Sequence, residues 1–93
     1  MHTDQTARRI RDVITSTPSL RVNVANLSDH DDLYAAGLKS LAMVHLMLAL
    51  EDEFAIEFPD SVLHRGSFAT VWRICHTVAG LMQLKPPLAA QTA

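Results

Sequence analysis

A strongly apolar segment from about Ser40 to Phe54 most limits what this chain can fold into. Its apolar residues recur at spacings of three and four, which predicts an α-helix. They form two stripes: Met43, Leu46, Met47, Leu50 and Phe54 on one, and Leu41, Val44 and Leu48 on an adjoining one. One stripe is enough for a core. We expect the first to be buried, and the second to be either buried as well or partly exposed as a docking surface.

Two further helices flank this segment. The first is predicted over about Asp4 to Ser16 and stops before Pro18, because a proline disfavours helical geometry in the residue before it. A long connection from Leu20 to Leu33 follows, and its apolar anchors are Val22, Val24, Leu27 and Leu33. Further along, we expect a short turn through Val62 and Leu63 and a break at His64 to Gly66.

The last helix is predicted from near Ser67 or Phe68 to about Gln83–Lys85, because Pro86 and Pro87 cannot continue it. Its predicted inward face is Val71, Ile74, Cys75, Val78, Leu81 and Met82. The chain has 93 residues, enough for one small domain. It is 48% apolar but only 5% aromatic, which favours a core of aliphatic and Met side chains on helices. We therefore expect an all-α fold, a small antiparallel four-helix bundle with three long helices and one short one, over residues 1–85, and a flexible C-terminal tail over 86–93.

The sequence argues against several classes of site. Cys75 is the single cysteine, so an internal disulfide and a Cys-pair metal site are excluded, and we expect it in the core. The five histidines include no pair spaced four apart on a helix, so we expect no metal. The N-terminus has no apolar targeting segment, and no apolar run reaches the roughly 18 residues that span a bilayer. We expect a cytoplasmic protein without membrane insertion.

Charge is unevenly distributed, although the net charge is only −2. Between Asp29 and Asp60 there are eight Asp and Glu residues against Lys39 alone, a net of −7, while the other residues sum to +5. An acidic face repels nucleic-acid phosphate and attracts basic protein surfaces. Nucleic-acid binding is therefore not expected.

Ser40 stands at the start of the apolar helix, just after Gly37 and Leu38. Its hydroxyl is a weak nucleophile without a base, and no Ser-His-Asp order or oxyanion-hole motif accompanies it, so we expect no catalytic residues and no enzyme. The first turn of a helix instead favours a phosphate, through unpaired N–H groups and the helix dipole. Taken alone, Ser40 would be read as an ordinary residue at a helix N-terminus.

The wider pattern resembles the acyl carrier protein family, in both its fatty-acid/polyketide and its peptidyl/aminoacyl branches. The matching residues are Gly37-Leu38, Ser40-Leu41, Glu51-Asp52-Glu53-Phe54 and Ile56-Glu57-Phe58-Pro59-Asp60. The resemblance implies that Ser40 carries a covalent 4′-phosphopantetheine arm, placed there from coenzyme A by a phosphopantetheinyl transferase with Mg²⁺. It further implies that an acyl- or amino-acid-activating ligase loads the arm's thiol, that downstream transferases take the cargo, and that the carrier is a monomer.

The chain also departs from that family. Lys39 replaces the commonest aspartate, and Ala42 and His45 stand at partner-facing positions that fatty-acid carriers often make acidic. These departures favour a stand-alone aminoacyl carrier with its own ligase. The residues expected to face partners are Lys39, Leu41, Val44, His45, Leu48 and Glu51, although His45 could be merely exposed. The alternative function is a carrier-like interaction module without an arm. The sequence does not identify the cargo.

Overall fold

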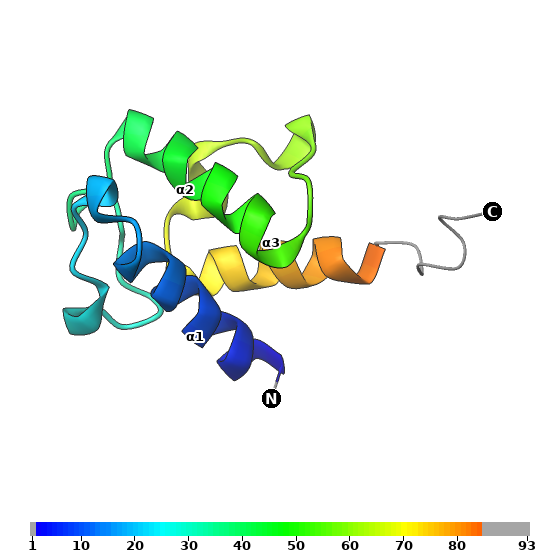
Figure 1. The fold of residues 1–93 in the computed structure, drawn as a ribbon, viewed down its shortest axis with the longest axis horizontal. Coiled ribbons are helices and arrows are strands. Elements are labelled where there is room, and N and C mark those ends of the chain that lie inside the picture. The colour runs from blue at the N-terminus through cyan, green and yellow to red at the C-terminus, as the bar shows by residue number, and fades with distance from the viewer. Residues whose placement is uncertain (1, 85–93) are drawn as a thin grey trace.

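Helices make up the computed structural model, which describes residues 2–84. The three α-helices are α1 (His2–Thr15), α2 (Ser40–Phe54) and α3 (Val71–Leu84), as Figure 1 shows. Short 3₁₀ helices lie between them: η1 (Pro18–Leu20), η2 (Val24–Asn26), η3 (Asp60–Val62) and η4 (Arg65–Phe68). No strand occurs in residues 2–84, which confirms the all-α prediction. Within the same residues, no helix is long and apolar enough to cross a membrane.

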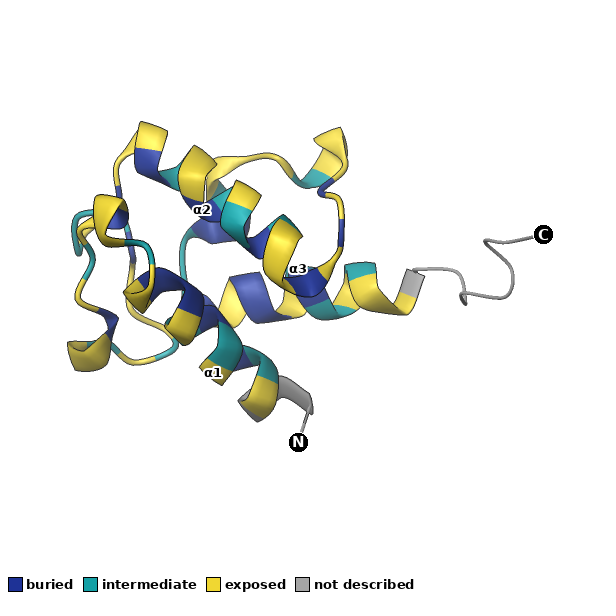
Figure 2. Cartoon of the chain, in the orientation of Figure 1, coloured by how far each residue is buried: buried dark blue, intermediate teal, exposed yellow. Residues whose placement is uncertain are grey.

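The core forms where α1 packs against both α2 and α3. In Figure 1, α2 and α3 run in the opposite sense to α1. Each helix contributes one buried side, seen as the dark bands in Figure 2. The side chains with no exposed surface include Ile10 from α1, Leu46 and Leu50 from α2, and Ile74 and Val78 from α3. Aliphatic side chains therefore dominate this core, as the composition predicted.

The element boundaries agree with the prediction for α2 and for the end of α3 at Leu84, and they differ at the start of α1 and of α3. α1 covers His2–Thr15, where Asp4 to Ser16 was expected. α3 begins at Val71, later than predicted, because the Thr70 Oγ1 accepts a hydrogen bond of 2.9 Å from the Arg73 N–H and so caps the helix there. Residues 65–68, which include the end of the expected break and the expected start of the last helix, form η4. The predicted tail over 86–93 lies outside the described residues.

The buried face of α2 is rotated from the predicted one. The buried residues are Ala42, Leu46, Leu50 and Phe54, spaced four apart. Met43 and Met47, expected in the core, are only half-buried, and Ala42, expected to face partners, is a core residue. The predicted second stripe is exposed: Leu41 by 68%, Val44 by 38% and Leu48 by 52%. Since α2 is apolar on most sides, the periodicity alone did not decide which side faces the core.

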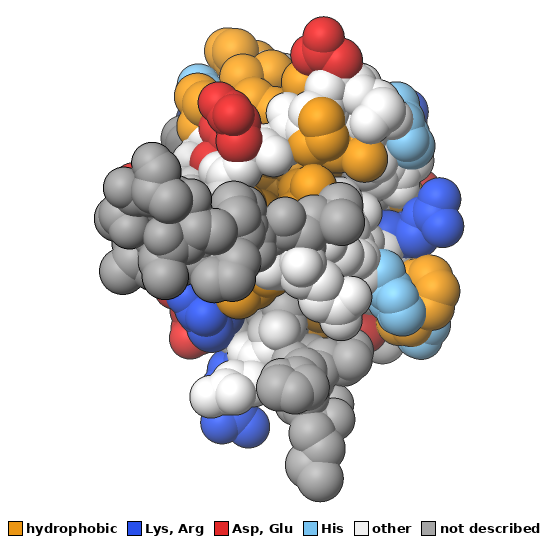
Figure 3. Space-filling view, turned by 90° about the vertical axis from the view of Figure 1, so that its right-hand side faces the viewer, with side chains coloured by type: hydrophobic (Ala, Val, Ile, Leu, Met, Phe, Trp, Pro, Cys, Tyr) orange, Lys and Arg blue, Asp and Glu red, His pale blue; other side chains and the backbone are white. Residues whose placement is uncertain are grey.

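The α3 prediction is correct for its first three turns. Val71, Ile74, Cys75 and Val78 are buried. Met82, predicted to point inward, is 40% exposed, so that part of the prediction is wrong. Figure 3 views the molecule from the right-hand side of Figure 1 and shows hydrophobic side chains between acidic ones on that face. Exposed apolar surface is therefore not confined to α2.

Arg11 holds the long connection between α1 and α2 in place. Its guanidinium donates hydrogen bonds to the carbonyl oxygens of Val24 (2.8 Å) and Leu27 (2.9 Å), and to Asp29 Oδ1 (2.6 Å). Val24 and Leu33 are buried, while Val22 and Leu27 pack against the core at its edge. One half-buried side chain of α1 thus fixes the path of a connection that carries only two short 3₁₀ helices.

Candidate functional site

Ser40 is the first residue of α2, and it is exposed. Lys39 precedes it with an extended backbone, its carbonyl oxygen accepts the Met43 N–H at 2.8 Å, and its side chain makes no capping hydrogen bond. The N–H groups of the first helical turn have no partner within the helix. No acidic residue stands in that turn. A phosphate on the Ser40 oxygen would therefore meet unpaired donors and the positive end of the helix dipole.

The turn before Ser40 depends on Gly37. This residue has φ of +120°, a region that favours glycine. A Cβ added there would lie 3.3 Å from the Arg21 carbonyl oxygen, so two parts of the chain approach closely at this point. The adjacent Leu38 is buried, and its N–H bonds to the Leu33 carbonyl oxygen at 3.0 Å. Gly37 and Leu38 together set the direction in which the chain enters α2.

Tyr34 ties this turn to η4. Its hydroxyl donates a hydrogen bond of 2.7 Å to the Arg65 carbonyl oxygen, and the Arg65 guanidinium lies 3.7 Å from the centre of its ring. Its own N–H bonds to Asp32 Oδ1 at 2.9 Å. Burial raises the pKa of the Tyr34 hydroxyl, Arg65 opposes that rise, and Asp32 adds to it. The segment that leads to Ser40 is thus held by the hydrogen bonds of the Tyr34 N–H and hydroxyl and by the Leu38 N–H bond.

The structure brings most of the predicted partner residues to one exposed side of α2. Leu41, Val44, His45 and Leu48 are exposed on that helix, and Lys39 is exposed just before it. The sixth predicted partner residue, Glu51, is less exposed than these five.

Glu51 is half-buried, and its Oε2 accepts the Phe58 N–H at 2.9 Å. Its carbonyl oxygen also accepts the Ile56 N–H at 3.1 Å. Glu51 therefore anchors the chain where it leaves α2, a structural role that the sequence analysis did not predict. Arg21 was not predicted either, and the fold places it with Lys39 in the lining of a groove next to Ser40. No local sequence signal links these two residues, which come to one groove through the close approach of Arg21 to Gly37.

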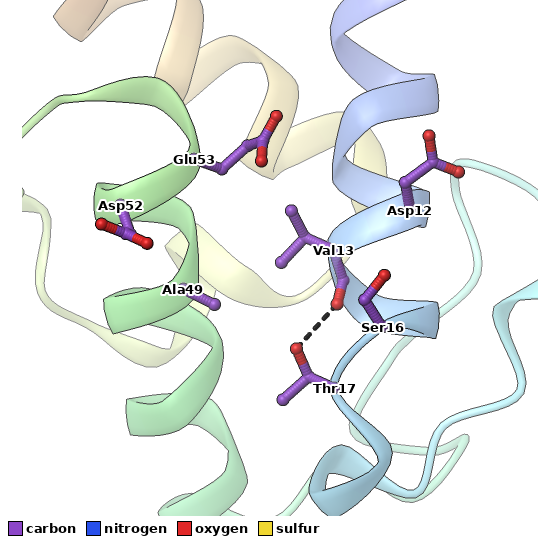
Figure 4. Close-up of a pocket in the computed structure, with 7 residues that line it drawn as sticks. All are labelled: Asp12, Val13, Ser16, Thr17, Ala49, Asp52 and Glu53. Atoms are coloured by element: carbon purple, nitrogen blue, oxygen red, sulfur yellow. Dashed lines mark hydrogen bonds between the residues drawn. The ribbon is translucent and has the colours of Figure 1, made fainter.

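A second hollow, of about 220 Å³, lies between α1 and α2 and is bordered by Asp12, Asp52 and Glu53. In Figure 4 the carboxylates of Asp12 and Asp52 lie on opposite sides of it and do not converge. Glu53 is paired with Arg9 at 3.0 Å. Among the described residues, no group of three or more His, Cys, Asp or Glu side chains could hold a metal ion. Asp52 and Glu53, together with Glu51, make the C-terminal end of α2 acidic.

Comparison with known proteins gives consistent results. The profile of a family described as "Phosphopantetheine attachment site" matches residues 8–84. An aminoacyl carrier protein of Agrobacterium fabrum is 48% identical over 69 residues, which cover 74% of this chain and 83% of that protein. A mitochondrial acyl carrier protein of Saccharomyces cerevisiae is 45% identical over 65 residues, which cover 63% of this chain and 50% of that protein.

Solved structures show the same likeness. One is a crystal structure of an engineered Bradyrhizobium japonicum glycine:[carrier protein] ligase complexed with a carrier protein from Agrobacterium tumefaciens and ATP. It contains a chain that superimposes with a TM-score of 0.74 at 44% identity, over 80% of this chain and 96% of that one. The corresponding complex with AMP gives a TM-score of 0.72 at 45% identity, over 78% of this chain and 97% of the other.

Proposed function

Because this chain belongs to the acyl carrier protein family, whose members carry covalent 4′-phosphopantetheine, we propose that Ser40 is the residue that bears the arm. The observation that carries this proposal is the place of Ser40, exposed on the first turn of α2 behind a fixed glycine turn. When attached, the group supplies a terminal thiol that holds cargo as a thioester. The protein is a carrier and not an enzyme, since the described chain positions an attachment point and the family does not catalyse a reaction itself.

Attachment requires a separate phosphopantetheinyl transferase. In this reaction the Ser40 oxygen forms a bond to the β-phosphorus of coenzyme A, its proton is released, and adenosine 3′,5′-bisphosphate leaves. The N–H groups of the first turn of α2 favour the resulting phosphodiester. Lys39 adds a positive charge next to it. Downstream transferases that receive the cargo belong to the same proposal.

The cargo that we propose is an amino acid. Support comes from the 48% identity to an aminoacyl carrier protein and from a carrier 44% identical to this chain that was crystallised with a glycine:[carrier protein] ligase. Lys39 and His45 add to this, because both stand where an acidic fatty-acid carrier would be negative. We infer that a separate amino-acid-activating ligase docks on the exposed residues Leu41, Val44 and Leu48 and loads the arm.

Intact mass tests the attachment site. Wild type, Ser40→Ala and the matched control Ser61→Ala, which alters another exposed serine, are incubated with coenzyme A, Mg²⁺ and a broad-specificity transferase. Wild type and the control should each gain the mass of one phosphopantetheine, and Ser40→Ala should gain none. Equal gain by Ser40→Ala would place the arm elsewhere. No gain by wild type would support an unmodified interaction module instead.

A panel of ligases then tests the cargo. Holo wild type is incubated with ATP and each of several amino-acid- and fatty-acid-activating ligases, with unmodified protein as the control. Mass gain of an amino acid on the holo form alone supports the proposal. Loading by fatty-acid ligases only would overturn it.

A further inference from the structure

A groove lies beside Ser40, between η1 with the following Arg21 and the first turns of α2. Its volume is about 500 Å³, which is within the roughly 300–1,000 Å³ typical of sites for small molecules. Lys39 and Leu41, the two neighbours of Ser40 in the chain, both line it. Ser40 itself does not line the groove, and a group attached to it enters the groove between these two neighbours.

The lining combines apolar and cationic side chains. Leu20, Leu41 and Ala42 supply its apolar surface. Leu41 is 68% exposed, more than any other large hydrophobic side chain in the described chain. Leaving so large an apolar surface in water is unfavourable unless something covers it.

The cationic part of the lining consists of Arg21 and Lys39, and the imidazole of His45 adds a polar group. Arg9 and Arg11 elsewhere in the molecule are paired with Glu53 and Asp29.

By contrast, the described chain offers no hydrogen-bond or ion-pair partner to the side chains of Arg21, Lys39 and His45, and no Asp or Glu is among the described residues that line the groove. The groove is thus a positively charged patch next to a segment that is otherwise acidic. An anionic ligand would complement the positive charge of this groove.

We propose that this groove holds the phosphopantetheine arm of the holo protein, with the phosphodiester at Arg21 and Lys39 and the branched pantoyl carbons against Leu41 and Ala42. The inference rests on the proposed role of Ser40. An arm of this kind begins with one negative phosphodiester and continues with a dimethyl-substituted carbon and two amides. The groove presents positive charge and apolar surface in the same order. His45 lies about 7.5 Å further along the helix than Ser40, at ~1.5 Å per residue, and on a different side of it, so the arm reaches this part of the lining by passing over Leu41.

This placement affects partner binding. Leu41 belongs both to the groove and to the exposed stripe Leu41, Val44 and Leu48. While the arm lies in the groove, it covers Leu41 and leaves only the rest of the stripe for docking. A partner that uses Leu41 therefore displaces the arm at the moment when it needs the thiol.

Nuclear magnetic resonance tests the inference without an activity assay. Uniformly labelled protein is converted to the holo form, and complete loading is verified by intact mass before any spectrum is recorded. Nuclear Overhauser effects from the pantoyl methyl groups are then measured in wild type, Leu41→Ala and Arg21→Gln. The matched controls are Leu63→Ala, which removes an exposed leucine elsewhere, and Arg8→Gln, which removes an exposed arginine of α1.

Holo wild type should show effects from the pantoyl methyls to the Leu41 and Ala42 side chains, and amide shifts on loading that extend to Arg21 and His45. Arg21→Gln should lose these effects and Leu41→Ala should lose those to Ala42, while both controls keep them. Shifts confined to Ser40 and its immediate neighbours, or effects to Val44 and Leu48 instead, would overturn the inference while leaving the attachment site intact. Absence of any mass gain would instead refute the proposed function and the inference with it.

Discussion

Replacing Leu46 and Leu48 by alanine, one at a time, tests the assignment of the two sides of α2. The two leucines are two positions apart on one helix, so they point to nearly opposite sides. Leu46 has no exposed surface, whereas Leu48 is 52% exposed. Because both variants make the same Leu→Ala change within one helix, differences in helix propensity cancel.

The expected magnitudes differ clearly. Truncation of a fully buried leucine loses the transfer free energy of its side chain and leaves a cavity, which together cost about 2–5 kcal/mol. Truncation of Leu48 removes a side chain already half in water, so we expect a loss of about 1 kcal/mol or less. A domain of this size loses roughly 4–8 °C of melting temperature per kcal/mol. Leu46→Ala should therefore melt about 10 °C or more below wild type.

Urea denaturation monitored by circular dichroism measures both losses, and unchanged slopes would show that the denatured states are comparable. Leu48→Ala should also weaken binding to the loading ligase. Equal losses of stability in the two variants would refute the assignment of Leu46 to the core and of Leu48 to the docking side.

Two further predictions concern backbone strain and ionisation. Ala55 ends α2 with a φ of +53°, which costs an L-residue about 1–2 kcal/mol. Ala55→Gly should therefore raise the free energy of unfolding, measured in urea, by about 0.5–1 kcal/mol, while the control Ala49→Gly in the helix interior should lower it by roughly as much. Stabilisation by both substitutions would contradict the strain argument. Burial, and to a lesser degree Asp29, raises the pKa of the Cys75 thiol from 9.0 to about 11, although Arg11 opposes this. The folded chain then keeps the proton that the unfolded chain releases, so this contribution to stability is complete below pH 9 and is lost as the pH rises to about 11, at no more than about 1.4 kcal/mol per pH unit. Chemical denaturation across that range should show a steeper loss for wild type than for Cys75→Ala, and parallel curves would mean that the thiol ionises equally in both states.

Local sequence signals predicted some parts of the fold and site correctly. The bounds of α2 follow from its apolar run, and the buried position of Cys75 follows from its place in an apolar helical segment. Both features are decided by neighbours in the chain. Met82 was predicted inside and Ala42 outside, and both predictions were wrong. Which apolar side of a helix faces the core depends on how the other helices pack against it, and periodicity does not contain that information.

Several contacts that the sequence did not predict join distant segments. Arg11 of α1 hydrogen-bonds to the connection between α1 and α2. Arg9 of α1 contacts the end of α2, where it pairs with Glu53 and lies 4.3 Å from the centre of the Phe54 ring. Arg21 meets the start of α2 for the same reason. An arginine has no local pattern that reveals its partner, so these residues became identifiable only in three dimensions.

The way in which Arg11 holds the connection also determines where the chain tolerates change. Its guanidinium binds carbonyl oxygens of the main chain at Val24 and Leu27, and every amino acid supplies such an oxygen. Ala25 and Asn26, which lie between them, are exposed. Their side chains are therefore open to substitution during evolution, and this tip is a suitable place for a fluorophore or an affinity tag that leaves the carrier's working surfaces untouched.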